Sequence, residues 1–308
     1  MTGGGRGPAV EGGAPGGTVG GGETPGAPVA AVVVNYESGP SLASCVRDLR
    51  DAGIDQVVVV DNGSVDGSTS LARTAVPDLE ILVPGSNLGY GAAANRGVAA
   101  TTAPLVLICN PDLEVGADAV SALVTALEAD SARALVGPLV RTPTGERYPS
   151  ARHFPSMVDA AGHAVLGIFM PDNRFTRSYQ RTELDHAPSE VRSVDWVSGA
   201  CFLVRRSAFE QVGGFDESYF MYAEDVDLCW RLGRAGWRVV YTPAAEITHI
   251  QGQSTDRHPY RMIFEHHRSL LRFASRSSQG WRAALLPVVA LGIAVRCGLA
   301  CLARATGR

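Results

Sequence analysis

Three acidic side chains stand within four residues, at Glu224, Asp225 and Asp227, directly after the aromatic run 219–222. The apolar spacing that follows predicts a short helix that begins with these acids and ends at Gly236. Acids at a helix start and arginines at its end also suit a well-capped surface helix. Three acids exceed what one cap needs, and the aromatic residues can wall a partly dry pocket. We therefore expect a carboxylate here to be held ready to take a proton from an alcohol.

Two further segments have residues suited to a nucleotide. Asp61 and Asp66 lie in a turn after an apolar strand, where an acid can accept hydrogen bonds from a base or ribose, although Asp, Asn, Gly and Ser also suffice for a plain turn. Residues 87–97 form a Gly-rich start to a helix, whose exposed N–H groups favour phosphate. The Gly spacing differs from the dinucleotide-binding fingerprint.

A possible cation site follows another buried strand, which closes at Asn110-Pro111-Asp112. A single acid here can hold a hard divalent cation when a diphosphate and water supply the remaining ligands. His249, which we expect in a loop, would add an imidazole; a lone loop histidine is more commonly plain polar surface. Mn²⁺ accepts such a mixed shell, whereas Mg²⁺ prefers oxygen ligands.

Alternating strands and helices must position these residues. We expect strands at 29–35, 57–60, 80–83 and 105–109, and helices at 41–52, 90–101 and 116–129. Continuous apolar strands separated by helices are typical of an α/β fold, here a Rossmann-like, mostly parallel sheet covered on both faces. Ligands of such sheets bind beyond the carboxyl ends of the strands. The four polar residues that follow strand ends should therefore meet along one rim: Asn35, Asp61, Asn87 and Asp112.

The second half of the chain is less regular. Residues 141–190 are rich in Pro, Arg and aromatics and suggest a long insertion over the cleft. Strand character returns at 194–205 and 237–241, and residues 259–275 predict an amphipathic helix. Residues 283–302 are mostly apolar but contain Pro and an Arg. Because a spanning helix wants about twenty apolar residues with few charges, we favour a helix that lies on the bilayer.

Composition excludes several chemistries. All 27 basic residues are Arg, so no Walker-type phosphate loop, pyridoxal Schiff base or Lys nucleophile is available. The six Cys contain no Cys-x-x-Cys pair and suit reduced core residues of a cytoplasmic protein.

Charge and glycine are both unevenly distributed. Residues 1–256 carry 18 Arg against 30 acids, whereas residues 257–308 carry 9 Arg against one Glu. The basic end suggests an anionic membrane surface or lipid phosphate; the acidic core disfavours nucleic acid. Residues 1–28 hold 12 Gly and 4 Pro, which predicts a disordered tail without the features of a signal peptide.

Taken in chain order, these motifs resemble the inverting nucleotide-sugar glycosyltransferases of the large A-type family, family 2, over roughly residues 29–270. That family uses a Rossmann-like sheet and a metal-binding Asp-x-Asp, which is Asn110-Pro111-Asp112 here and keeps one carboxylate. Within the family, four segments closely resemble the actinobacterial rhamnosyltransferases of cell-wall linker synthesis: Tyr148–Arg152, His163–Gly167, Val197–Cys201 and Phe215–Arg231.

The resemblance implies transfer of L-rhamnose, with inversion, from dTDP-L-rhamnose to N-acetylglucosaminyl-diphospho-polyprenol. It implies that Asp225 is the general base and that Asp112 and His249 hold a divalent cation, Mn²⁺ or Mg²⁺. The implied nucleotide-sugar contacts are Asn35, Tyr36, Asp61, Asn87, Gly91, Asn95 and Asn110. The implied acceptor contacts are Arg152, Trp196, Glu224, Arg257 and Arg261, since the planar fork of Arg grips phosphate.

The expected organisation is a glycosyltransferase domain over 29–256, with a nucleotide-binding half at 29–115 and an acceptor half at 116–256. A basic helical tail at 257–308 would hold the enzyme at the cytoplasmic face of the cell membrane. Two alternatives stay open: a related transferase with another donor or acceptor, as in capsule or O-antigen synthesis, and a noncatalytic nucleotide- or membrane-binding protein.

Overall fold

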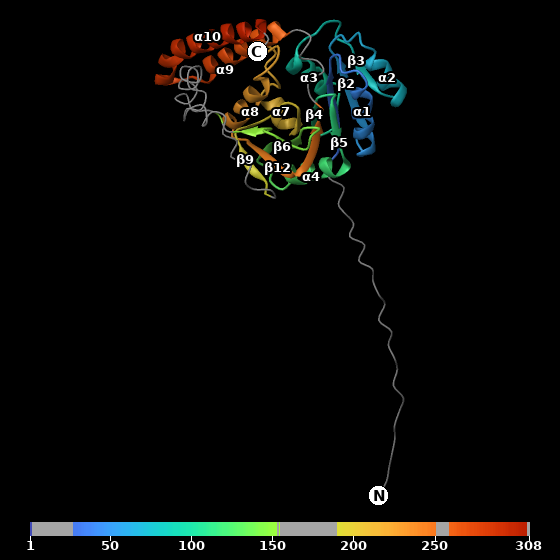
Figure 1. Ribbon diagram of the computed structural model, residues 1–308. Helices are drawn as coiled ribbons and strands as arrows, with labels where there is room; N and C mark the ends of the chain where they lie inside the picture. The colour runs from blue at the N-terminus through green and yellow to red at the C-terminus, as the bar shows by residue number, and fades with distance from the viewer. Residues whose placement is uncertain (2–26, 153, 155–189, 251–258, 307–308) are drawn as a thin grey trace.

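The computed structural model describes Met1 and residues 27–152, 154, 190–250 and 259–306 (Figure 1). Most of the predicted N-terminal tail, most of the predicted insertion and Arg257 lie outside the described residues.

The first half of the chain builds a parallel sheet with helices between its strands. The strands pair in parallel, with β1 joined to β2 and β4, and β2 to β3. Their bounds are β1 (Val29–Asn35), β2 (Gln56–Asp61), β3 (Glu80–Leu82) and β4 (Leu105–Cys109). The helices are α1 (Ser41–Asp51), α2 (Ser68–Ala75), α3 (Tyr90–Ala99) and α4 (Ala117–Glu128). These elements confirm the predicted pattern to within two residues at most ends.

The second half extends the same sheet with mixed pairing. The strand order is β3-β2-β1-β4-β11-β6-β12-β5, in which β11 runs antiparallel to both of its neighbours. The added strands are β5 (Leu113–Val115), β6 (Arg133–Arg141), β11 (Cys201–Arg205) and β12 (Arg238–His249). Shorter strands are β7 (Arg147–Tyr148), β8 (Ala151–Arg152), β9 (Arg192–Val194) and β10 (Trp196–Val197). The helices here are α7 (Arg206–Gln211) and α8 (Glu224–Arg234).

Apolar residues on alternate positions of the strands pack against helices on both faces of the sheet. One face holds α1, α2 and α4, through residues such as Leu42 and Leu123. The other face holds α3, α7 and α8, through residues such as Val98 and Leu228. This three-layer arrangement fixes the ends of the strands, because every central strand is buried from both sides.

The second half differs from the expectation in three places. The predicted strand region 194–205 is divided into β9, β10 and β11, which pair with different partners. β6 was not predicted, because Gly137 and Pro138 interrupt its apolar run. β12 is twelve residues long rather than five, and it continues past Pro243 through a register shift between Thr242 and Glu246. His249 is consequently the last residue of a strand, paired with Leu113, and the prediction of a loop there was wrong.

Two long helices form the C-terminal end of the described chain. Helix α9 (Pro259–Ser277) and helix α10 (Leu286–Ala305) follow one another across a short 3₁₀ helix, η3 (Gly280–Leu285). They lie side by side along one end of the molecule, above α8 (Figure 1). Among the described residues one segment, Ala283–Ala305, is long and apolar enough to cross a membrane, with a mean hydropathy of 2.2.

Candidate functional site

A cavity of about 120 Å³ opens at the carboxyl ends of β1 and β4, where the fold predicts a ligand. Its walls come from both halves of the chain and from α9. Five of the predicted site residues line it: Tyr36, Asn87, Asn110, Asp112 and Arg261. The others that line it are Val34, Ser38, Asn62, Gly89, Tyr90, Pro111, Phe220, Met221 and Met262.

The structure brings Asp112 and His249 together at this cavity. His249 Nε2 lies 3.1 Å from Asp112 Oδ1 and 3.5 Å from Asn110 Nδ2. The antiparallel pairing of β5 with β12 causes this contact, and the Ile250 amide donates to the Asp112 carbonyl at 2.9 Å. One carboxylate and one imidazole in adjacent positions suit a cation that completes its shell with substrate oxygens. No group of three His, Cys, Asp or Glu side chains suited to a metal occurs in the described ranges.

Asn35 and Asp61 lie at neighbouring strand ends, as predicted, but they face each other inside the protein. The Asn35 amide donates to Asp61 Oδ1 at 2.8 Å, and both side chains are buried. Asp61 also accepts hydrogen bonds from the backbone and hydroxyl of Ser64. The pair therefore braces the loop behind Tyr36, and the neighbours Tyr36, Ser38 and Asn62 reach the cavity while Asn35 and Asp61 do not line it.

The Gly-rich start of α3 is partly occupied by the protein itself. The Tyr90 amide donates to the Phe220 carbonyl at 3.1 Å, and the Gly89 amide donates to Asn87 Oδ1 at 2.9 Å. The prediction of freely exposed N–H groups at this helix start was therefore wrong for these two. A Cβ at Gly89 would lie 2.2 Å from the Phe220 oxygen, and one at Gly91 would lie 2.9 Å from Phe215. Close packing of segment 215–220 accounts for both glycines.

Asn95 also contacts segment 215–220 and does not line the cavity. Its side-chain amide donates to the Phe215 carbonyl at 2.9 Å, and its oxygen accepts from the Phe215 amide at 2.8 Å. Neither Gly91 nor Asn95 lines the cavity, so this geometry gives no support to their predicted role in nucleotide-sugar binding.

Glu224 and Asp225 begin α8, as predicted, and the helix ends at Arg234, two residues before the predicted end at Gly236. Asp225 accepts the Gly199 amide on Oδ2 and its neighbour's amide, that of Val226, on Oδ1, both at 2.8 Å. Burial raises the pKa of Asp225. Burial and the adjacent Asp225 charge raise the pKa of Glu224 to about 8. Since the two carboxyls are neighbours on the chain and both are buried, they titrate as a pair, and the second negative charge is disfavoured.

The backbone that leads into α8 is strained. Tyr222 and Ala223 have φ angles of 69° and 63°, in the left-handed region that non-Gly residues rarely adopt. Each such residue costs roughly 1–3 kcal/mol, and the conformation persists only where surrounding contacts over-determine it. Strain of this kind concentrates at functional sites, and here it directly precedes the two carboxyls.

A short hydrogen-bonded path connects Asp225 with the cavity. Tyr90 lines the cavity, and its hydroxyl donates to the Gly199 carbonyl at 2.5 Å. The Gly199 amide in turn donates to Asp225. The amide of Asn110 donates to the next carbonyl, that of Ala200, at 2.9 Å. Asp112 and Asp225 therefore flank one region of the molecule. Tyr90 and Gly199 were not among the predicted site residues, and only their position between strand ends links them to it.

The predicted acceptor contacts come from several elements. Arg152 on β8 stacks over the Trp196 ring on β10 at 5.6 Å, and its charge lowers the pKa of Asp225. Arg261 on α9 lies over the Phe220 ring at 4.4 Å and lines the cavity. Arg152 thus belongs to the acceptor half and Arg261 to the C-terminal helical segment, and Glu224 lies between them in sequence.

This fold and site define a nucleotide-sugar glycosyltransferase of the A type. The family model for glycosyl transferase family 2 matches residues 30–213, and the model for glycosyl transferase family group 2 matches residues 153–299. The chain belongs to glycosyl transferase family 2 and is an enzyme, which removes the noncatalytic alternative.

Similarity to individual proteins narrows the class. The chain is 45% identical, over 82% of its length and 86% of the relative's, to N-acetylglucosaminyl-diphospho-decaprenol L-rhamnosyltransferase of Mycobacterium tuberculosis. It is 37% identical to Rhamnosyltransferase WbbL of Escherichia coli, over 41% of this chain and 44% of that protein. The fold is similar to that of a mannosyltransferase from Pyrobaculum calidifontis solved with GDP-Man and Mn²⁺, with TM-score 0.55, 19% identity, and coverage of 92% and 80%.

Proposed function

We propose that this enzyme transfers L-rhamnose from dTDP-L-rhamnose to an N-acetylglucosaminyl-diphospho-polyprenol, in the synthesis of a cell-wall linker. The observation that carries the proposal is the 45% identity, across more than four fifths of both chains, to an enzyme of that name. The order of the site residues along the chain is consistent with it.

In the proposed reaction Asp225 removes the proton from the acceptor sugar hydroxyl. The resulting oxygen attacks the anomeric carbon of the donor from the face opposite the nucleotide, so one displacement forms the new bond with inversion and releases the nucleotide. The raised pKa of Asp225 favours this role, because a stronger base takes a proton from an alcohol more readily. The backbone amides of Gly199 and Val226 orient the carboxylate.

Asp112 and His249 are the proposed cation ligands. Their contact at 3.1 Å fits a divalent cation bound jointly with the donor diphosphate, since the described part of the chain adds no third acidic or imidazole ligand to the pair. When bound, the cation neutralises charge on the leaving diphosphate. The mixed oxygen and nitrogen donor set favours Mn²⁺ over Mg²⁺.

The donor nucleotide would occupy the cavity beside Tyr36, Asn87 and Asn110, with Asn35 and Asp61 bracing its wall. The acceptor would approach from the side of Trp196 and Glu224. Its lipid diphosphate would be attracted by Arg152, Arg261 and Arg257, since one guanidinium group can donate two parallel hydrogen bonds to a phosphate. Of these, Arg257 lies outside the described residues.

The C-terminal helices supply a membrane contact for the proposed function at the cytoplasmic face. The exposed apolar residues of α10 recur at helical spacing, at Val288, Leu291, Val295, Leu299 and Leu302. Helix α10 lies along α9, which in turn packs on segment 216–230 through contacts such as Ser269 Oγ to the Met221 carbonyl at 2.9 Å. We propose that the two helices rest together on the bilayer, because a spanning α10 would draw the charged α9 into lipid.

The test is incubation of the full chain with dTDP-L-rhamnose and a synthetic GlcNAc-diphospho-lipid in vesicles, with EDTA, Mn²⁺ or Mg²⁺. We expect a rhamnosylated lipid in the presence of a cation and its loss with EDTA. Equimolar UDP- and GDP-sugars in competition decide the donor. If a galactosyl or mannosyl product predominates, the donor assignment is wrong and the related-transferase alternative is correct.

A further inference from the structure

We propose that Arg276 of α9 is a positioning residue that holds the strained turn presenting Glu224 and Asp225. The inference rests on the proposed function, in which Asp225 is the base. It goes further by assigning to the C-terminal helix a direct part in the geometry of the catalytic turn.

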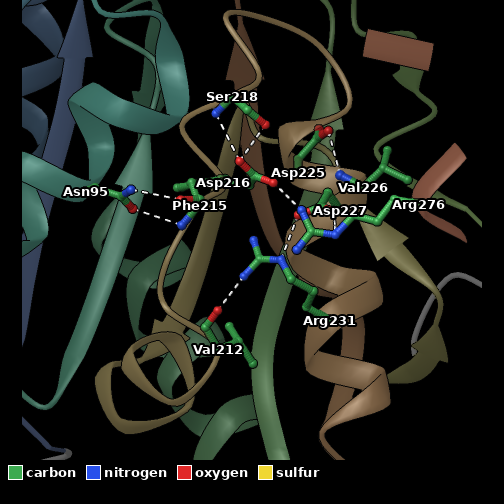
Figure 2. Close-up of polar contacts among 10 residues, drawn as sticks. All are labelled: Asn95, Val212, Phe215, Asp216, Ser218, Asp225, Val226, Asp227, Arg231 and Arg276. Atoms are coloured by element: carbon green, nitrogen blue, oxygen red, sulfur yellow. Dashed lines mark hydrogen bonds and ion pairs between the residues drawn. The ribbon is translucent and has the colours of Figure 1, made fainter. Parts of the chain in front are cut away.

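Arg276 contacts residues on both sides of the turn (Figure 2). Its Nη1 pairs with Asp216 Oδ2, before the turn, and its Nε lies 3.4 Å from Asp227 Oδ1, after it. The ten residues between these two acids contain both positive-φ positions and both carboxyls of the site. One guanidinium thus bridges the two ends of the strained segment.

Asp227 gives this bridge its strength. Its side chain is fully buried, and Arg231 donates to its Oδ2 at 2.6 Å. The other oxygen, Oδ1, has no hydrogen-bond partner, so the ion pair with Arg276 is its counter-charge. If Arg276 is lost, Arg231 still pairs with Oδ2, but the buried Oδ1 loses its ionic contact, which destabilises the charged side chain. The local structure is therefore expected to move if Arg276 is lost.

Other contacts hold the segment at its base and at single points along it. Asn95 fixes Phe215 from α3, and Arg231 Nη1 donates to the Val212 carbonyl at 2.6 Å (Figure 2). Asp216 is itself braced by the amide and hydroxyl of Ser218. Within the turn, the Phe220 carbonyl accepts from the Tyr90 amide, the Met221 carbonyl from the Ser269 hydroxyl, and Asp225 from the Gly199 amide. Each of these contacts holds one point, whereas the Arg276 guanidinium pairs with acids at both ends of the segment and so joins them.

A functional consequence follows from the position of the turn. Asp112 and His249 are held by strand pairing that does not involve α9. Relaxation of the turn should misplace Asp225 while it leaves the cation ligands in position. The main expected effect is a fall in kcat. Because Phe220 and Met221 of the same segment line the cavity, the KM for the sugar nucleotide should rise by a smaller factor.

The test compares Arg276→Gln with Arg268→Gln, a matched loss of an arginine on the same helix. Arg268 pairs with Glu265 within α9, at 3.1 Å, and does not contact the turn. We expect kcat to fall roughly tenfold in Arg276→Gln and to stay within about twofold of wild type in Arg268→Gln. Arg276→Lys should retain part of the rate, because a cation between the two acids is kept.

A second substitution separates positioning from a general loss of structure. In Arg276→Gln/Ala223→Gly the left-handed backbone at residue 223 is no longer strained, since Gly adopts it freely. We expect the double variant to recover most of the lost kcat. Failure of Ala223→Gly to raise the rate of Arg276→Gln, or equal rates in Arg276→Gln and Arg268→Gln, would overturn the proposal.

Hydrogen exchange of the amides of residues 217–226 keeps this test independent of the reaction. Faster exchange is expected in Arg276→Gln than in Arg268→Gln. If the wild-type protein is inactive, only the proposed function is refuted. The exchange rates would still test whether Arg276 holds the turn in place. If exchange in this segment is unchanged in Arg276→Gln, the positioning role of Arg276 is wrong, even when the enzyme is active.

Discussion

The two carboxylates proposed to act on opposite ends of the reaction are held in different ways. Asp112 follows a buried parallel strand, and the backbone pairing of β5 with β12 places His249 beside it. Asp225 follows two residues in left-handed conformation, and side-chain contacts from α3, α8 and α9 hold the segment that presents it. The donor side is fixed by the sheet, whereas the acceptor side is fixed by contacts distant in sequence.

The difference bears on how each side responds to change. Strand pairing distributes its energy over many backbone hydrogen bonds, so single substitutions at the donor side should alter chemistry more than shape. A strained turn held by a few charged side chains has few other contacts to keep its shape. Substitutions around it should therefore alter both the chemistry and the local structure. Substitutions on each side test this contrast.

Asp225→Asn should have the largest effect, on the acceptor side. The amide keeps the size of the side chain but cannot accept the acceptor proton, so we expect kcat to fall by roughly 10³-fold. Binding of dTDP-L-rhamnose, measured by calorimetry, should change little, because the donor cavity is intact. Asp118→Asn, at an exposed position in the first turn of α4, is the control. Near-normal turnover in folded Asp225→Asn would remove the base assignment.

Asp112→Asn tests the donor side, with a somewhat smaller effect. Loss of the only carboxylate of the pair should raise the Mn²⁺ concentration for half-maximal activity by about 100-fold, while excess Mn²⁺ restores part of the rate. Glu114→Gln, two residues further along on β5 and with an exposed side chain, is the matched control. An unchanged Mn²⁺ titration in Asp112→Asn would place the cation elsewhere.

The regular half of this contrast is the part that sequence predicts well. The predicted bounds of β1 and β4 are those of the structure, because unbroken β-branched runs admit few other conformations. β6 was missed because Gly137 and Pro138 resemble a break. In the folded chain a Cβ at Gly137 would lie 2.7 Å from Val197, so the glycine permits close packing of β10. Sequence patterns do not contain that neighbour.

The site divides in the same way. Asp112, Asn110 and Tyr36 follow strand ends, and the general rule for ligand position in α/β sheets was enough to bring them to one cavity. The left-handed turn at Tyr222 and Ala223 contains no Gly, so the sequence does not indicate it. The bridge from Arg276 to Asp216 joins residues 60 positions apart. Both depend on tertiary contacts, which spacing along one chain does not encode.

The junction between the two sides is tested by a pair of glycine substitutions. Gly89 and Gly85 have φ angles of 86° and 85°, so alanine is strained at each position. At Gly89 the new Cβ would also meet the Phe220 carbonyl oxygen, whereas at Gly85 it meets no atom within 4 Å. Gly89→Ala should therefore lose a further 1–3 kcal/mol in urea unfolding. Equal losses of unfolding free energy in Gly89→Ala and Gly85→Ala would show that the Phe220 segment can move away from α3 at little cost.

Glu224→Gln should have the smallest effect, on stability and only above mildly acidic pH. In the folded protein the pKa of Glu224 is about 8, above its ordinary value of 4.5. Between these values the unfolded chain has released the proton that the folded chain keeps, so the free energy of unfolding falls as pH rises from about 4.5 to 8. Glutamine does not titrate, and Glu224→Gln is therefore free of this penalty.

We expect Glu224→Gln to unfold at a temperature close to that of wild type at pH 4.5 and roughly 5 °C higher at pH 8.5, a gain on the order of 2 kcal/mol. The gain is less than the full pKa shift would give, because the Asp225 carboxyl titrates with Glu224. Glu80→Gln is the control, since the Glu80 side chain on β3 is exposed in the folded chain. A difference between Glu224→Gln and wild type that stays constant from pH 4.5 to 8.5 would mean that Glu224 is ionised in the folded enzyme. Asp225 would then stand beside a second negative charge, and contacts with Arg152 and other cations would have to hold both carboxylates in place.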